Sequence, residues 1–349
     1  MLPVELVKII CDNMDTHQEM LAYLSTANYF DSCKKQVCWN KKPVAPTTKI
    51  IQLPYYDAFS RIILTKEACY KLPKYLKELH FVSVFDSVTI AEHFFAQNLP
   101  YLTSLILYAD NSEMLDGLLG KYEYINTLRL HNNNPGVIQN VKWHLAKNLE
   151  TLEVYCGEYV RQEKLPKTLK RLVLGICFEI YSLPPSLQEL EIKYGCDHLL
   201  LQGIFPTTLK KLCLGKNYNR EMQECVLPEG LTELEFGKHF NQRILSGTFP
   251  SSIKKITFGD QFNQSIANLP EGVEHIKVGL DFDEAHFLHK DVPSTLKEVH
   301  VPRESDGHVK QCKNFAIIGY NHPKYKDSTP PGIWESIHNL FVNTFSIKK

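Results

Sequence analysis

The sequence carries no net charge. Lys and Arg total 39 residues, and Asp and Glu also total 39, in a chain of 349 residues. Proteins that attract nucleic acid or an anionic lipid surface usually show a basic excess, because that excess gathers phosphate groups. Its absence argues against nucleic acid and against a membrane surface as partners.

Long apolar runs and an export signal are also missing. Nowhere do 18 apolar residues follow one another, so no membrane-spanning helix is expected. The opening residues, Met1 to Leu6, have neither the basic segment and apolar run nor the cleavage pattern of a signal peptide. The ten cysteines include no C-x-x-C spacing, and we expect them to be reduced, in the cytoplasm.

Motifs that carry catalysis or bind a metal are not found. The sequence contains no G-x-G-x-x-G, no G-x-x-x-x-G-K-[ST] and no G-x-S-x-G. His286 and His289 form the densest histidine pair, but they lack the flanking pattern typical of a zinc site. We therefore expect no catalytic residue, no metal and no cofactor, and predict that the protein is not an enzyme.

What the sequence does contain is an internal repeat. The segments LPKTLKRLVLG, which starts at Leu165, and LPEGLTELEFG, which starts at Leu227, are versions of one phrase. Its central apolar residue recurs eleven times over 220 residues, which is a mean spacing of 22 residues. The central residues are Leu79, Leu105, Leu128, Leu152, Leu172, Leu190, Leu212, Leu234, Ile256, Ile276 and Val299.

Each phrase predicts a turn followed by a short strand. Its last positions alternate polar and apolar residues and then reach Gly, which is typical of a strand with one buried face. In seven consecutive repeats a Pro lies six residues before the central residue, where it cannot continue a strand. Because one 22-residue unit cannot bury its apolar face alone, neighbouring units must stack. We predict an α+β repeat protein, a leucine-rich-repeat-like solenoid of about eleven repeats with a parallel sheet.

A second signature follows several of the predicted strands. Phe240-Asn241-Gln242-Arg243-Ile244 and Phe262-Asn263-Gln264-Ser265-Ile266 share the pattern F-N-x-x-I, with relatives at Tyr218-Asn219 and Phe282-Asp283. Together with the Leu-Pro-x-x-Leu phrase, this pattern resembles the FNIP repeat, a leucine-rich-repeat relative, most clearly over residues 165–301. We expect the Asn side chains to stack into a ladder that satisfies backbone groups, and not to bind a ligand.

The first forty residues lack the repeat and have helical periodicity. The sequence LPVELVKII from Leu2, followed by an acidic break and a second apolar helix, resembles an F-box. That resemblance implies docking onto a Skp-type adaptor of a cullin ubiquitin ligase. F-box and FNIP repeat proteins are described in amoebae and large DNA viruses, and for a viral protein the expected location is the host cytoplasm. The residues that would bind the adaptor are Leu2, Pro3, Leu6, Ile9, Ile10, Leu21 and Leu24.

An alternative interpretation of this segment stays open. The same apolar residues could simply cap the first repeat, since the ends of a solenoid need covering. The chain would then be a repeat scaffold with a non-ligase N-terminal cap. Under either interpretation the predicted organisation is a helical module at 1–40, a linker or degenerate first repeat at 41–71, the solenoid at 72–302, and a loop with a capping helix at 303–349.

Two columns of polar residues flank the central positions on the predicted exposed face. The charge column, directly before the central residue, alternates in sign and predicts a ladder of ion pairs between neighbouring strands. The target column, directly after the central residue, shows no such alternation, so we predict that it selects a protein target. The charge column comprises Arg171, Glu189, Lys211, Glu233, Lys255, His275 and Glu298, and the target column Val173, Glu191, Cys213, Glu235, Thr257, Lys277 and His300.

Overall fold

The structure is a computed structural model, and the chain forms two compact units, Met1–Cys177 (unit 1) and Phe178–Lys349 (unit 2). The residues that it describes are 61–64, 72–81, 97–108, 111–132, 135–156, 164–177, 180, 182–195, 197–283, 292–303, 309–311 and 315–321. The predicted helical module at 1–40, with its seven adaptor residues, and the predicted capping helix lie outside the described residues.

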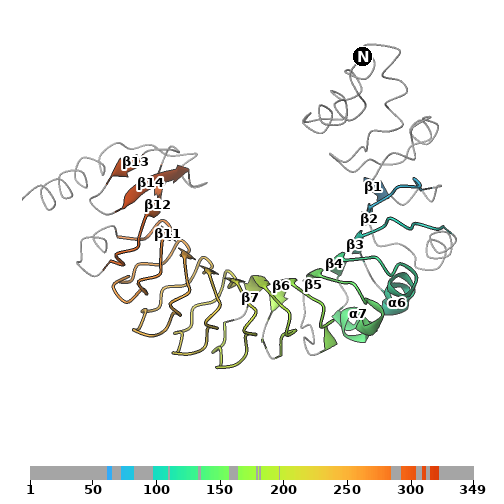
Figure 1. Ribbon diagram of the computed structural model, residues 1–349, viewed down its shortest axis with the longest axis horizontal. Coiled ribbons are helices and arrows are strands. Elements are labelled where there is room, and N and C mark those ends of the chain that lie inside the picture. The colour runs from blue at the N-terminus through green and yellow to red at the C-terminus, as the bar shows by residue number, and fades with distance from the viewer. Residues whose placement is uncertain are drawn as a thin grey trace, which may run out of the picture. The chain divides into compact units, whose positions relative to one another are not determined.

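Unit 1 contains a parallel sheet (Figure 1). Between some of its strands the chain forms helices α6 (Ser112–Lys121) and α7 (Pro135–Asn140) and the 3-10 helix η2 (Trp143–Leu145). The side chain of Asn111 caps α6 by accepting a 2.7 Å hydrogen bond from the Glu113 N–H. The strands are β1 (Arg61–Leu64), β2 (Glu78–Phe81), β3 (Ser104–Tyr108), β4 (Thr127–Asn132), β5 (Thr151–Cys156) and β6 (Arg171–Cys177).

Unit 2 is built mainly of short strands joined by turns and irregular segments (Figure 1). Its parallel strands are β7 (Glu189–Gly195), β8 (Lys211–Cys213), β9 (Glu233–Glu235), β10 (Lys255–Thr257), β11 (His275–Lys277), β12 (Glu298–Arg303) and β14 (Ala316–Asn321). A further strand, β13 (Val309–Gln311), pairs antiparallel with β14.

The strand register confirms the predicted parallel solenoid. In unit 2 the central residues pair directly from strand to strand, as in Leu212 with Leu234 and Ile256 with Ile276. All eleven predicted central residues lie in strands, and each is at most 1% exposed. The regular structure of the described residues is mostly strand with few helices, so these residues do not show the helical part of the predicted α+β class.

Proline explains how each turn returns to the same place. The proline carbonyl accepts a hydrogen bond from the N–H three residues later: the Leu231 N–H donates to Pro228 at 3.0 Å, and the Ile253 N–H donates to Pro250 at 3.2 Å. This is the hydrogen bond of a β-turn. The proline itself has no N–H to leave unpaired, and the apolar residue that closes the turn points into the core. Each repeat therefore enters its strand in register.

The core of unit 2 contains a column of stacked aromatic rings. Phe240 and Phe262, the first residues of the F-N-x-x-I pattern, have ring centroids 6.0 Å apart, and Tyr218 and Phe282 extend the column on either side. Phe258 stacks on Phe262 with centroids 3.8 Å apart. Each turn thus packs its aromatic residue between those of its neighbours, as a shared core requires.

The asparagines form the predicted ladder. The Oδ1 of Asn219 accepts from the N–H of Asn241 at 2.9 Å, and the Oδ1 of Asn241 accepts from the N–H of Asn263 at 2.9 Å. Asp197 begins the ladder by accepting from the Asn219 N–H, and in the last described bond the Asp283 N–H donates to the Asn263 Oδ1. These amide oxygens satisfy backbone donors that the turn leaves unpaired. The Asn side chains therefore have a structural role.

Thr248 provides a first test of the core. It is 3% exposed, and its hydroxyl has no hydrogen-bond partner in the described structure. A buried hydroxyl without a partner is destabilising. Val226 lies at the same place one repeat earlier, so valine fits this environment. We expect Thr248→Val to raise the free energy of unfolding by about 1 kcal/mol in a denaturant titration. Unchanged or lower stability would show that the hydroxyl has a partner.

Candidate protein-binding surface

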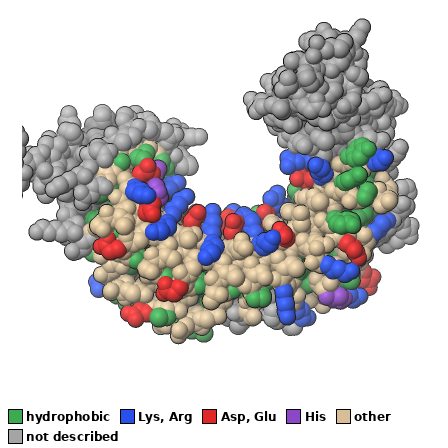
Figure 2. Space-filling model, viewed as in Figure 1, with side chains coloured by type: hydrophobic (Ala, Val, Ile, Leu, Met, Phe, Trp, Pro, Cys, Tyr) green, Lys and Arg blue, Asp and Glu red, His purple; other side chains and the backbone are tan. Residues whose placement is uncertain are grey.

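The exposed face of the unit 2 sheet carries most of the charge column and most of the target column, whose first members, Arg171 and Val173, lie in β6 of unit 1. Period-2 alternation places both columns opposite the buried central residues. In Figure 2, Lys, Arg, Asp and Glu side chains gather over the strands of this unit, joined by His side chains near β11 and β12. A rigid sheet thus presents charged groups at the regular spacing of its strands, about 4.8 Å.

The predicted ladder is present in unit 2, although its contacts are uneven. Lys211 lies between Glu189 and Glu233 in the register of the strands, and its Nζ is 3.7 Å from the Glu233 carboxylate. His275 Nδ1 is 3.2 Å from the Glu298 carboxylate on the next strand. Lys255 forms no ion pair with any described residue, although Glu233 and His275 flank it in register. The ladder therefore leaves one lysine uncompensated.

Reversing the charge at Lys211 tests the ladder. We expect Lys211→Glu to lower the free energy of unfolding by about 1 kcal/mol, because Glu would then lie between Glu189 and Glu233. The side chains are partly exposed, so added salt should reduce the effect. Thermal melts at low and high salt measure both. A variant as stable as the wild type at low salt would contradict an interacting ladder.

Two residues predicted in the target column are not available to a partner. Val173 is 1% exposed and Cys213 is 8% exposed, so neither contributes a contact surface. Both are short side chains beside longer ones: Glu153 pairs with Val173 in register, and Glu191 and Glu235 flank Cys213. Burial, reinforced by the nearby Glu235 carboxylate, raises the pKa of the Cys213 thiol to about 12. The remaining members, Glu191, Glu235, Thr257, Lys277 and His300, are partly or fully exposed.

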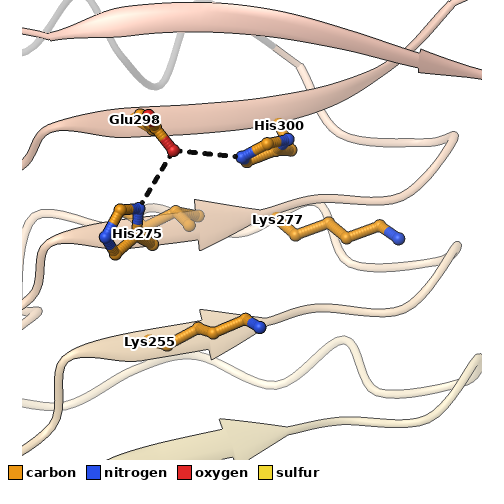
Figure 3. Close-up of a pocket in the computed structure, with 6 residues that line it drawn as sticks. Lys255, His275, Lys277, Glu298 and His300 are labelled. Carbon is orange, nitrogen blue, oxygen red and sulfur yellow. Dashed lines mark hydrogen bonds and ion pairs between the residues drawn. The ribbon is translucent and has the colours of Figure 1, made fainter. Parts of the chain in front are cut away.

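A concave part of this face lies over β10, β11 and β12. We call it the β10–β12 hollow, and its volume is about 430 Å³. Figure 3 shows the Glu298 carboxylate between the imidazoles of His275 and His300, with Lys255 and Lys277 beside them. The residues that line the hollow are Lys255, His275, Ile276, Lys277, Glu298 and His300, which come from both columns.

Contacts within the hollow fix some of these groups. The Glu298 carboxylate is 3.2 Å from His275 Nδ1 and 3.5 Å from His300 Nε2, so one carboxylate serves both imidazoles. The Nζ of Lys277 lies 4.2 Å from the centroid of the Tyr320 ring, a cation–π contact that holds the lysine in place. The Tyr320 hydroxyl in turn donates to the Val278 carbonyl at 2.9 Å.

The charge of the hollow favours an anion over a metal ion. Two lysines outnumber the single carboxylate, and both imidazoles can donate hydrogen bonds. Among the residues that the structure describes, no group of three or more His, Cys, Asp or Glu side chains is arranged to hold a metal ion. The hollow is therefore suited to bind a negatively charged group.

The exposed face of unit 1 is organised differently. Arg129 Nε and the Glu153 carboxylate are 2.5 Å apart, and the Tyr155 hydroxyl donates to the same carboxylate at 3.1 Å. Burial alone would raise the pKa of Glu153, but the hydrogen bond and charge of Arg129 lower it. The His131 ring is stacked between Tyr108 and Tyr155, and burial together with Arg129 lowers its pKa. These groups satisfy one another and leave little charge for a partner.

Unit 1 also has a row of exposed tyrosines that the sequence analysis missed. Tyr75, Tyr101 and Tyr124 are 44%, 48% and 67% exposed and occupy the same place in three successive turns, directly before the buried residue that closes each turn. The rings of Tyr75 and Tyr101 have centroids 5.4 Å apart. In unit 2 the equivalent Thr208 and Ser252 instead donate hydrogen bonds to carbonyls of the previous turn. A search for aromatic residues at the repeat period would have found the row.

The comparisons with known proteins concern the repeats. The FNIP repeat family matches residues 197–239 and 240–281. No curated protein matches the chain. Among the described residues, moreover, no helix has the length and apolar character needed to cross a membrane.

Two solved structures are similar in part. CroV588, described as a novel circular LRR protein, is 23% identical with a TM-score of 0.49, and the match covers 70% of this chain and 40% of that one. This chain thus spans less than half the length of CroV588. The leucine-rich repeat-containing protein LegL7 from Legionella pneumophila is 16% identical with a TM-score of 0.33, covering 80% of this chain and 93% of LegL7. The array is a leucine-rich-repeat-like solenoid by its own strand register, and its residues 197–281 match the FNIP repeat.

Proposed function

We propose that this chain is a non-enzymatic interaction protein of the cytoplasm whose repeat array captures a protein target. The observation that carries the proposal is the β10–β12 hollow, in which partly exposed charged side chains of three neighbouring strands line one concavity. Solenoids use such extended, rigid surfaces for binding other proteins. The match of residues 197–281 to the FNIP repeat supports a repeat-mediated role.

The finer proposal is that residues 1–40 dock onto a Skp-type adaptor, which makes the chain a substrate-recruiting F-box subunit of a cullin ubiquitin ligase. Its support is the F-box-like sequence from Leu2 together with the FNIP repeats that follow it. The alternative is a scaffold in which the N-terminal segment only caps the array. The two differ in one measurable property, which is adaptor binding.

Binding of a purified Skp-type adaptor to the full chain separates these alternatives. Under the ligase proposal, the wild type binds the adaptor and the double variant Leu2→Ala with Pro3→Ala binds at least tenfold more weakly. The exposed Lys254→Ala, far along the chain in unit 2, serves as a control and should bind normally. Absence of adaptor binding by the wild type would contradict the ligase proposal and leave the scaffold as the better interpretation.

A further inference from the structure

Charge is unevenly distributed along the exposed face of unit 2. Over β7 to β9 both columns are mainly acidic, with four carboxylates against the lysines Lys193 and Lys211. Over β10 to β12 the balance reverses, because Glu298 is the single carboxylate among the described lining residues of the hollow. The four carboxylates over β7 to β9 belong to Glu189, Glu191, Glu233 and Glu235.

We propose that the β10–β12 hollow binds an aspartate or glutamate side chain of an extended acidic segment in a protein partner. The carboxylates over β7 to β9 repel that segment and so confine it to the β10–β12 end of the face. This inference rests on the proposed capture of a protein by the array and names the chemistry that the array recognises.

Lys255 is the principal binding group. It is exposed, it lines the hollow, and its Nζ has no ion-pair partner among the described residues. A bound carboxylate would therefore gain an ion pair without displacing an existing one. Lys277 is exposed as well, and its contact with the Tyr320 ring reduces the side-chain freedom that binding would otherwise have to remove.

The described lining of the hollow lacks the side chain that is best suited to bind phosphate, and so fits a carboxylate better. His275 and His300 already share the Glu298 carboxylate, so an incoming anion lies close to a fixed negative charge. A phosphate group carries close to two negative charges at neutral pH, so Glu298 would repel it more strongly than a carboxylate, while the two lysines would also attract it more strongly. Arginine, which binds phosphate through two parallel hydrogen bonds, is not among the described lining residues.

The size of the hollow fits a segment and not only one side chain. Its volume of about 430 Å³ lies within the range of roughly 300–1,000 Å³ that is usual for ligand pockets. Lys255 and Lys277 lie on adjacent strands, which are about 4.8 Å apart, and are offset by two residues in register. Acidic side chains that project from one extended segment can reach both lysines.

The experiment measures binding of a fluorescein-labelled peptide of alternating Glu and Gly residues to the full chain by fluorescence anisotropy at low salt. The same peptide with Gln in place of Glu is the uncharged probe. We expect Lys255→Glu with Lys277→Glu to weaken binding of the Glu peptide at least tenfold. Glu191→Lys with Glu235→Lys should strengthen it, since the repelling carboxylates are removed.

The matched control is Lys216→Glu with Lys238→Glu. It replaces two exposed lysines on neighbouring turns and changes the net charge by the same amount, but neither residue lines the hollow. Binding of the Glu peptide should fall less than threefold. An equal loss in both double variants would show that only net charge matters and would overturn the site. Equal binding of the Gln peptide would also overturn it.

Two further measurements test whether the hollow prefers phosphate to carboxylate, and whether peptide binding is independent of adaptor docking. A phosphoserine peptide of the same length that binds tenfold more tightly than the Glu peptide, and loses binding in Lys255→Glu with Lys277→Glu, would overturn the carboxylate assignment. The Leu2→Ala with Pro3→Ala variant should bind the Glu peptide like the wild type. Failure of adaptor docking and failure of the hollow are thereby observed separately.

Discussion

Truncation of Phe262 to alanine should lower the free energy of unfolding of unit 2 by about 3–5 kcal/mol. The side chain is 0% exposed, and its ring packs between those of Phe240 and Phe282 while stacking on Phe258. Removing the ring leaves a cavity that the neighbouring turns cannot fill, because their strands are held in register. Denaturant titration of the full chain, followed by far-UV circular dichroism, measures the loss.

Two other variants make this result interpretable. Phe262→Leu keeps most of the apolar volume and should cost clearly less than the alanine variant. The exposed Lys254→Ala should change stability by well under 1 kcal/mol. If Phe262→Ala and Lys254→Ala had equal effects, the assignment of the F-N-x-x-I phenylalanines to the core would be wrong.

Gly259→Ala should destabilise unit 2 by about 3 kcal/mol, the upper end of the usual cost of overpacking. A Cβ at this position would lie 2.1 Å from the Gly237 carbonyl oxygen and 2.5 Å from its carbon, far inside van der Waals contact. The obstacle is the backbone of the preceding turn, so no side chain can move aside to make room. Gly237 and Gly279 have the same close approach, and together they form a glycine column in which successive turns touch directly.

A helical glycine offers a control of opposite sign. Gly120 lies in α6, and a Cβ there would meet no atom within 4 Å. Gly120→Ala should therefore stabilise the helix by about 0.5–1 kcal/mol through the better helix propensity of alanine. Thermal unfolding compares the two variants. A Gly259→Ala protein as stable as the wild type would mean that the turns are spaced more widely than the structure shows.

The buried half of the fold was predictable from the sequence because it repeats. From Tyr218 to Phe282 each turn supplies a central residue, a turn-closing residue and an aromatic residue at fixed places, and these requirements recur at the repeat period. Even the Asn ladder could be anticipated, since one acceptor per turn at a constant position must meet the same neighbour each time. A residue pattern that would predict a strand only weakly in one segment predicts it strongly when it recurs in every repeat.

Elements without the repeated phrase were missed. Strands β13 and β14 lie in the range 303–349, which the sequence predicts as a loop and a capping helix. No Leu-Pro-x-x-Leu phrase precedes β14, yet Val299 pairs in register with Ile317, which is 3% exposed. Strand β1, by contrast, places Ile62 opposite Leu79 in the range 41–71, for which the sequence left open a linker or a degenerate first repeat. Strands β13 and β14 are specified by pairing with a neighbouring strand, and their local sequence does not carry the repeat pattern.

The sequence predicted which face of the sheet carries the candidate site, but it did not predict which residues of that face line the hollow. Alternation identifies which positions point away from the core, but exposure also depends on the length of the side chains alongside. For that reason the target column wrongly included Val173 and Cys213, which lie below longer neighbours. The β10–β12 hollow is lined by residues from both columns. The prediction gave one column an internal role and the other a binding role, and so separated groups that line the same hollow.

The Asn ladder gives the array a direction. Each amide oxygen accepts from the turn that follows it, so Asn241 serves the backbone of Asn263 while its own N–H is bound by Asn219. In Asn241→Ala the substituted turn would keep its own N–H protected, and the Asn263 N–H would lose its acceptor. Amide hydrogen exchange should then accelerate at Asn263 and remain slow at Asn241. Loss of a ladder asparagine therefore removes a hydrogen bond from the turn that follows it in the sequence, and leaves the N–H of its own turn bonded.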